Sequence, residues 1–297
     1  MKVDKRKYLH PEMVAKLNNM ALRARLVVEG YIIGMHKSPY HGFSVEFAEH
    51  RAYGPGDEIR HVDWKLYGKT DRYYIKQFEE ETNLRSYLLL DTSKSMTYSS
   101  HKISKLDYGS YLAAAMTYLM LAQQDGVSIS LFDDGIKSFV PPRSTPGHLN
   151  TVLAQLENLS TGQDTHIAPA LHNLAERIKK RGLIILISDL IDDPEEVLTG
   201  LKHFRHKKHE VIVFHLLDPK ETEFDFSVRT RFMDMETGDQ ITTEPWQIQS
   251  AYQRVVKQFQ EKYKMECRKR NIDYVPLYTN EAVHTTIEIV RALRVRS

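Results

Sequence analysis

Side chains with oxygen donors follow two apolar runs in this sequence. The segment DTSKS at 91–95 comes directly after YLLL at 87–90, and Asp189 comes directly after LIILIS at 183–188. Thr165 lies in a polar loop ahead of the helical pattern that leads into the second run. Hydroxyl and carboxylate oxygens suit Mg²⁺, which takes octahedral oxygen coordination and keeps some of its waters. Two aspartates would roughly neutralise one such ion, and neutral hydroxyl ligands would leave it able to accept a further carboxylate.

Strands alternate with helices from residue 86 onward. The continuous apolar run at 87–90 predicts a strand that is buried on both faces, and further strands are predicted at 127–132, 183–188, 211–217 and 274–278. Helical patterns separate them, at 106–124, 148–159, 167–181 and 245–270, and Asp193 before Pro194 predicts the capped start of another helix. The run at 136–140 predicts a hairpin partner at the sheet edge. This order is typical of a doubly wound, mostly parallel α/β sheet, whose ligands bind beyond the carboxyl ends of its strands.

The first 85 residues have a different character. A helical pattern begins after Pro11 and stops at Gly30. Turn residues then separate runs rich in Val, Ile, Tyr, Phe and Trp, at 44–53, 59–67 and 72–81, which predict a small antiparallel sheet. We therefore expect two domains: 1–85, with an N-terminal helix and a small β element, and 86–297, with the α/β sheet.

The spacing of Asp91, Ser93 and Ser95, with a later Thr and a later strand-end Asp, resembles the metal-ion-dependent adhesion site of von Willebrand factor A domains. The longer segment from HGFSVEFAEHRAYGPGDE at 41 to LLLDTSKSM at 96 resembles the signature of domain-of-unknown-function family 58. Proteins of that family are von Willebrand A-like and are typically encoded beside MoxR-type AAA+ ATPases. The resemblance implies a von Willebrand factor A-like fold for the α/β part of the chain.

The same resemblance assigns five metal-site roles, to Asp91, Ser93, Ser95, Thr165 and Asp189. It implies that the two serines coordinate directly, that Thr165 does so in one state of the site, and that the two aspartates act partly through water. This chain has Gln163-Asp164-Thr165 where von Willebrand A domains often have Gly-Gly-Thr, so Thr161 is a second candidate for the third hydroxyl ligand.

A non-enzymatic, metal-dependent protein-interaction module is the function that this resemblance favours. The expected ion is Mg²⁺, with Mn²⁺ or Ca²⁺ as alternatives, and it would receive an acidic side chain of a partner. The implied partner is a MoxR-type AAA+ ATPase, and the pair would act in chaperone-like assembly or maturation of a client protein. Two alternatives stay open: a metal-dependent hydrolase with Asp164 or His166 as its base, and a metal-free scaffold.

The sequence lacks the residues that several other enzymatic reactions require. A haloacid-dehalogenase-type phosphatase needs a second Asp where this chain has Ser93, and the sequence contains no GxxxxGK[ST], GxGxxG or GxSxG motif. The three histidines in HFRHKKHE at 203–210 are interleaved with cations, so we expect them on a solvated helix face.

Composition excludes further classes. The 297 residues carry 41 Lys and Arg against 39 Asp and Glu, a balance that does not favour nucleic-acid binding. The single cysteine, Cys267, excludes a disulfide framework and suits a reducing compartment. The most apolar stretch, at 111–122, is shorter than the roughly 20 residues that span a bilayer, and the first residues lack a signal-peptide pattern. We expect a cytoplasmic protein.

Overall fold

The structure is a computed structural model that describes residues 19–25, 50–52, 54, 64–71, 73–76, 84–162, 166–233 and 238–283. The chain divides into two compact units. One consists of Met1–His36 together with Leu84–Ser297, and the other of Lys37–Asn83.

Within the described residues, six strands form one sheet in the order β10-β7-β6-β3-β4-β5. Neighbouring strands are parallel except for β4 and β5, which form an antiparallel pair at one edge. The predicted doubly wound, mostly parallel von Willebrand factor A-like sheet is confirmed. The strands are β3 (Arg85–Asp91), β4 (Gly126–Phe132), β5 (Ile136–Arg143), β6 (Leu183–Ser188), β7 (Glu210–Leu217) and β10 (Asp273–Tyr278).

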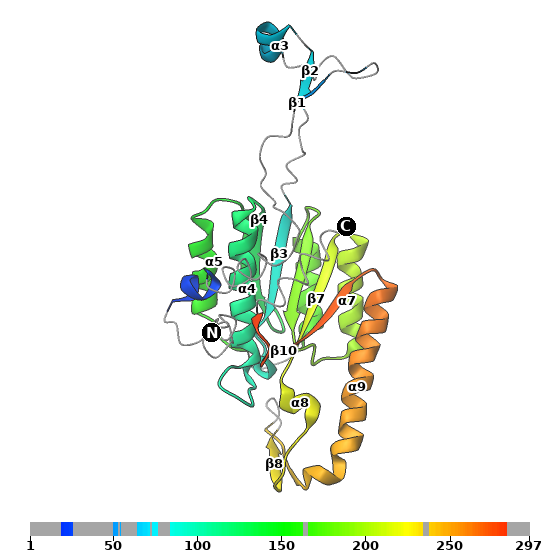
Figure 1. Ribbon diagram of the computed structural model, residues 1–297. Helices are drawn as coiled ribbons and strands as arrows, with labels where there is room; N and C mark the ends of the chain where they lie inside the picture. Colours follow the sequence, from blue (N-terminus) through cyan, green and yellow to red (C-terminus); the bar gives the residue numbers. More distant parts are fainter. Residues whose placement is uncertain are drawn as a thin grey trace, which may run out of the picture. The chain divides into compact units, whose positions relative to one another are not determined.

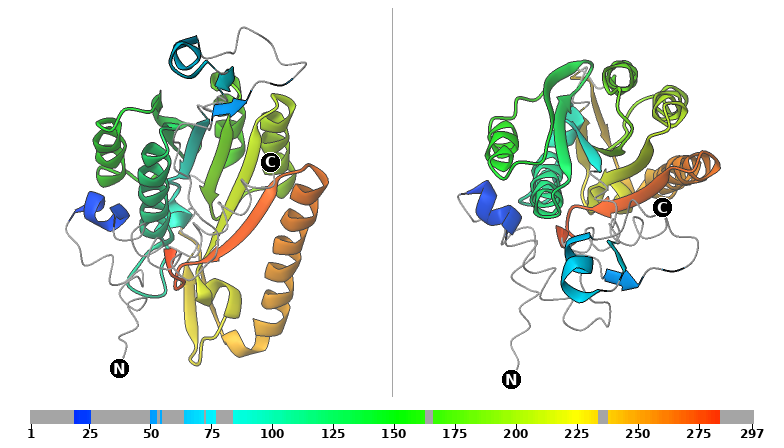
Figure 2. Two further views of the ribbon diagram at one scale, coloured as in Figure 1. Left: turned by 45° about the horizontal axis from the view of Figure 1, so that its top comes forward. Right: turned by 90° about the horizontal axis from the view of Figure 1, so that it is seen from above.

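Helices cover both faces of the sheet (Figure 2). Leu88 and Leu90 of β3 face one apolar core with α4 and α5, whereas Tyr87 and Leu89 face a second core with α6, α7 and α9. This alternation explains why the strands are apolar at consecutive positions. The helices are α4 (Lys105–Ala122), α5 (His148–Glu157), α6 (Ile167–Arg177), α7 (Pro194–His206) and α9 (Pro245–Lys269).

Strands β3 and β6 lie at the switch point of the sheet. From β3 the chain continues through α4 to β4 on one side, and from β6 it continues through α7 to β7 on the other. In open α/β sheets, ligands bind in the crevice outside the carboxyl ends of the two strands at such a point, a place that is called the β3–β6 crevice below. Asp91 ends β3, and Asp189 directly follows β6.

The N-terminal helical segment belongs to the α/β unit, whereas the sequence analysis groups it with the small β element. Residues 20–25 are helical, and the side chains of Met20 and Ala24 are buried in the core that contains α4. Arg23 also donates to the Tyr111 hydroxyl of α4 at 3.2 Å. The apolar face of this segment is thus buried against α4, which the sequence pattern alone does not indicate.

In the second unit, β1 (His50–Ala52) pairs with β2 (Tyr74–Lys76) in an antiparallel two-stranded sheet, in agreement with the prediction. The predicted strand at 59–67 is wrong for its last residues, because Trp64–Thr70 forms helix α3. Trp64 and Tyr67 stack edge to face three residues apart, a spacing that suits a helix. Residues 59–63 lie outside the described part of the chain, as do 284–297.

After β7 the chain forms an excursion that the sequence predicts only in part. It contains the short helix α8 (Pro219–Glu223) and a turn signal at 236–239, where the sequence predicts the hairpin that β8 (Thr230–Met233) and β9 (Gln240–Thr243) form; α8 was not expected. Figure 1 shows α8 and this hairpin beyond the carboxyl end of β7. Among the described helices, none is long and apolar enough to cross a membrane.

Candidate metal centre

Asp91 is an entirely buried carboxylate at the end of β3. One oxygen accepts the backbone N–H of Ser93 at 2.8 Å, and the other accepts the hydroxyl of Ser188 at 2.6 Å. Burial, followed by the nearby charge of Asp189, raises the pKa of Asp91 to about 7. Among the described residues, no cationic side chain forms an ion pair with Asp91, so its negative charge lacks a counter-ion.

Ser93 and Ser95 present their hydroxyl groups side by side. The chain turns after β3 into a short 3₁₀ helix, Lys94–Thr97, and this turn brings the two hydroxyl oxygens to 3.1 Å. Two adjacent ligands of an octahedral Mg²⁺, each about 2.1 Å from the ion, are separated by about 3.0 Å. The serine pair therefore fits two neighbouring ligand positions, and Ser93 is wholly buried while Ser95 is 8% exposed.

The third predicted ligand, Thr165, lies outside the described residues, but the loop that leads to it is held at the site. The backbone N–H of Gly162 donates to the carbonyl of Thr92 at 3.0 Å. A Cβ at Gly162 would lie 2.0 Å from a carboxylate oxygen of Asp133, so a side chain at this position would have to displace Asp133. Thr161, the alternative ligand, is exposed.

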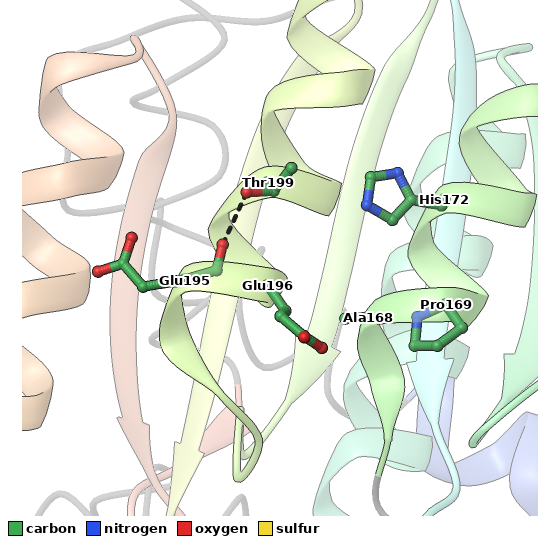
Figure 3. Close-up of a pocket in the computed structure, with 6 residues that line it drawn as sticks. All are labelled: Ala168, Pro169, His172, Glu195, Glu196 and Thr199. Carbon is green, nitrogen blue, oxygen red and sulfur yellow. Dashed lines mark hydrogen bonds between the residues drawn. The ribbon is translucent and has the colours of Figure 1, made fainter.

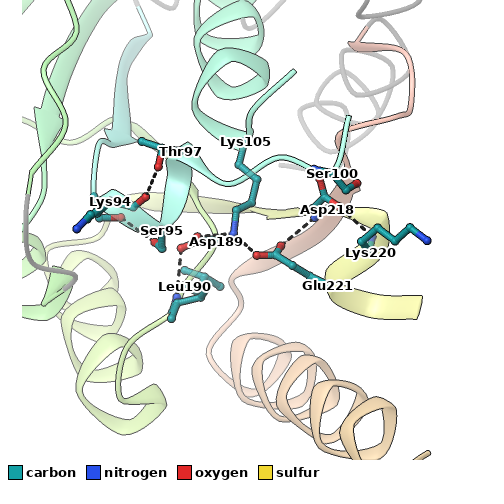
Figure 4. A network of polar contacts seen from close by, with 12 residues as sticks. Lys94, Ser95, Thr97, Ser100, Lys105, Asp189, Leu190, Asp218, Lys220 and Glu221 are labelled. Atoms are coloured by element: carbon teal, nitrogen blue, oxygen red, sulfur yellow. Dashed lines mark hydrogen bonds and ion pairs between the residues drawn. The ribbon is translucent and has the colours of Figure 1, made fainter. Parts of the chain in front are cut away.

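Lys105 is the residue at this site that the sequence analysis missed. It is the first residue of α4, yet its side chain is entirely buried, and its ammonium lies 2.7 Å from both Asp189 and Glu221 (Figure 4). A cation in the first turn of a helix opposes the helix dipole. That unfavourable position is the sequence signal that could have indicated a nearby acidic partner.

The segment that follows β7 contacts the loop after the serine pair and the first residue of α4. Glu221 and Asp218 form the capping box of α8, with the Glu221 carboxylate accepting the N–H of Asp218 at 3.1 Å. Asp218 also accepts the N–H of Ser100 at 2.8 Å. The loop between the serine pair and α4 is thereby fixed against α8, and Lys105 lies between them (Figure 4).

His215 lies next to Asp189 from the neighbouring strand β7. Its ring hydrogen-bonds the Tyr274 hydroxyl at 2.5 Å, and the side chain is 1% exposed. Burial lowers the pKa of His215 to about 4, so the imidazole is neutral at pH 7. His166, the histidine that sequence reasoning offered as a base, instead has a 76% exposed side chain beside Asp192.

The remaining acids near β6 have structural partners. Asp192 accepts the N–H of Ile167 at 2.8 Å and so caps α6 from another element. Asp193 accepts the N–H of Glu195 at 2.8 Å and caps α7, as the sequence predicts. In the described part of the chain, no three His, Cys, Asp or Glu side chains gather to hold a metal. An ion at this site would therefore depend on the serine hydroxyls.

A separate pocket lies between α6 and α7 and shares none of the predicted ligands. Figure 3 shows the residues that line it: Ala168, Pro169, His172, Glu195, Glu196 and Thr199. His172 contacts His203 of α7, with the two Nδ1 atoms 3.3 Å apart, and His203 pairs with Glu176 at 2.8 Å.

Of the histidines expected on a solvated face, His209 is instead buried, because its ring packs edge-on against Tyr87 and Phe204.

The fold and the site together define a von Willebrand factor A-like α/β protein. The family described as "Protein of unknown function DUF58" matches residues 49–264, and the chain belongs to this family. Uncharacterised proteins of Mycobacterium tuberculosis and Mycobacterium bovis are 26% identical to it over 231 residues, covering 77% of this chain and 72% of each relative.

One solved structure shares the fold. The crystal structure of the conserved hypothetical protein BatB from Bacteroides thetaiotaomicron aligns with a TM-score of 0.50 and 18% identity, covering 72% of this chain and all of that one. The crystal structure of the SpRpn10 VWA domain aligns with a TM-score of 0.36 and 10% identity, over 69% of this chain and 93% of that one.

Proposed function

We propose that this protein is a non-enzymatic interaction module in which Mg²⁺ at the β3–β6 crevice receives an acidic side chain of a partner protein. Ser93 and Ser95 would bind the ion directly, and Asp91 and Asp189 would balance its charge, partly through water. Thr165 would supply a third hydroxyl in one state of the site. Mn²⁺ or Ca²⁺ could take the same place.

The hydroxyl pair beside Asp91 favours an ion more than any other feature of the described residues. The serine oxygens have the separation of neighbouring octahedral ligands, and the adjacent carboxylate is buried with hydrogen bonds but without an ion pair. A buried carboxylate is costly unless a cation or protonation neutralises it. A divalent ion would supply the missing positive charge.

The donor set suits binding more than catalysis. Hydrolysis by a metal-bound water needs a positioned proton acceptor near the ion. His215 is a weak base, because burial lowers its pKa to about 4, and its ring is engaged by the Tyr274 hydroxyl. The side chain of His166 is 76% exposed beside Asp192, and Asp164 lies outside the described residues. An ion held mainly by neutral hydroxyls keeps most of its charge, and so it can attract a carboxylate from outside.

The partner in this proposal is a MoxR-type AAA+ ATPase, and the pair would act in assembly or maturation of a client protein. Membership of the DUF58 family supports the choice, because the resemblance described above associates that family with such ATPases. A partner Asp or Glu that reaches the crevice would complete the coordination of the ion.

A pull-down against the MoxR-type ATPase encoded beside this protein tests the proposal. We expect binding in Mg²⁺, loss in EDTA, and loss for Asp91→Asn and for Ser93→Ala. Ser128→Ala is the matched control, because this buried β4 hydroxyl bonds only the carbonyl of Val140 in the described structure. Equal binding by all proteins in EDTA would contradict the ion-dependent module and favour a metal-free scaffold.

A further inference from the structure

We propose that Lys105 is a built-in counter-cation of the metal centre, which weakens the affinity of the site for divalent ions by competing for Asp189. This inference rests on the proposed ion site. The five predicted ligands would bind the ion, whereas the Lys105 ammonium is itself a cation that would compete with the ion for Asp189.

The contacts of Lys105 place its charge at the edge of the crevice. Its Nζ atom lies 2.7 Å from Oδ2 of Asp189 and 2.7 Å from Oε1 of Glu221. Its side chain has no exposed surface, and that of Asp189 is 1% exposed. The ring of Tyr98 covers the ammonium with its centroid 5.7 Å away. The ion pair is thus shielded from solvent, so its effect on a neighbouring charge is strong.

Lys105 and an incoming ion would compete for the carboxylate of Asp189. Oδ2 is held by Lys105, while Oδ1 accepts, from the residues that the structure describes, only a long contact from the N–H of Ile191, at 3.4 Å. An incoming ion therefore meets one oxygen of an already neutralised carboxylate. Without the ammonium, the ion would meet the full charges of Asp91, Asp189 and Glu221, and it would bind more tightly.

Neutralising Glu221 should change the ion affinity in the opposite direction to removing the Lys105 ammonium. It shares the ammonium with Asp189, so it draws part of the positive charge away from the site. If Glu221 becomes neutral, Lys105 interacts with Asp189 alone, and Asp189 is less available to an ion. A purely structural bridge between α4 and α8 would instead predict that loss of either partner weakens ion binding in the same direction.

Calorimetric titration of the full chain with Mn²⁺, and with Mg²⁺ as competitor, separates these possibilities. We expect Lys105→Met to bind Mn²⁺ at least tenfold more tightly than wild type and Glu221→Gln to bind it several-fold more weakly. Lys220→Met removes a nearby exposed cation that pairs with Asp225 and, among the described contacts, does not pair with Asp189, so it serves as the control and should stay within twofold of wild type.

A stability measurement covers the case in which Lys105→Met folds poorly. Removal of a buried cation leaves its acidic partners uncompensated, so the thermal midpoint of this variant should fall in EDTA and recover in Mn²⁺. If needed, the variant is purified in Mn²⁺ and its affinity is measured by competition with a chelator. This keeps the affinity comparison possible even for a variant that needs the ion to fold.

The outcomes distinguish this inference from the proposed function. If wild type binds Mn²⁺ and Lys105→Met binds it no more tightly, the counter-cation role is wrong and the ion site stands. If only Lys105→Met binds, the counter-cation role is supported and the ion-dependent function of wild type fails. If neither binds, both are wrong.

Discussion

Asp91→Asn should stabilise the folded protein in the absence of divalent ions, although it removes a residue of the functional site. The wild-type carboxylate is buried, and its pKa is raised from 3.8 to about 7. Between pH 4 and 7 the folded state therefore binds more protons than the unfolded state, and the contribution of Asp91 to stability falls as the pH rises. Asn does not titrate, so the advantage of the variant should grow over this range and level off above pH 7.

The size of the effect follows from the change in pKa. At about 1.4 kcal/mol per pH unit, the difference between 3.8 and about 7 corresponds to roughly 4 kcal/mol, which is an upper limit for the gain at pH 8. The amide keeps an acceptor for the N–H of Ser93 but has to rearrange its contact with Ser188, so we expect about 1–3 kcal/mol. For a domain of this size that raises the thermal midpoint by roughly 2–10 °C.

Calorimetric or fluorescence-monitored unfolding at pH 5 and pH 8 in EDTA measures this gain. Asp133→Asn is the matched control, another carboxylate near a strand end of the same sheet. Burial works against its ionisation, but hydrogen bonding and pairing with Lys137 prevail and lower its pKa, so its neutralisation should not stabilise the protein. Adding Mg²⁺ should stabilise wild type, by about 2.7 kcal/mol at 100 times its Kd, and leave Asp91→Asn unchanged. A variant that is less stable than wild type at pH 8 in EDTA would refute the reasoning.

Three further predictions concern the serine pair, Gly162 and Cys267. Ser93→Ala combined with Ser95→Ala should abolish Mn²⁺ binding in a calorimetric titration while the circular dichroism spectrum stays unchanged; retained binding would exclude the hydroxyl pair as ligands. Gly162→Ala should cost about 1–3 kcal/mol of stability in denaturant unfolding, because its Cβ displaces Asp133; an unchanged midpoint would mean that the loop adapts freely. Cys267 should resist alkylation at pH 8 until the protein is denatured, because burial raises its pKa to about 12; rapid labelling of the native protein would show that α9 detaches.

The sheet could be predicted because its signal is local. Runs such as LIILI at 183–187 are apolar at every position, and in the structure alternate residues of the run enter the two opposite cores. The cap at Asp193 was equally local, since a capping residue, a proline and acids follow one another in the chain. The segment at 59–67 was ambiguous, because its aromatic and branched residues suit a strand while Trp64 and Tyr67 also have helical spacing.

The sequence could predict those residues of the candidate site that are close together in the chain or that directly follow a strand. Asp91, Ser93 and Ser95 lie within five residues, and the strand order brings Asp189 beside them. Lys105 could not be assigned in this way, because its partners are 84 and 116 residues away in the sequence. Glu221 belongs to a short helix whose position depends on how the chain leaves β7. Such contacts follow from tertiary packing and leave little trace in local patterns.

The most direct measurement is a calorimetric titration of wild type with Mn²⁺, next to the Ser93→Ala/Ser95→Ala double variant and the Ser128→Ala control. The account predicts one site per chain in wild type and in the control, competition by Mg²⁺, and no binding to the double variant. Absence of binding to wild type, or equal binding to all three proteins, would contradict a metal centre built on the serine pair.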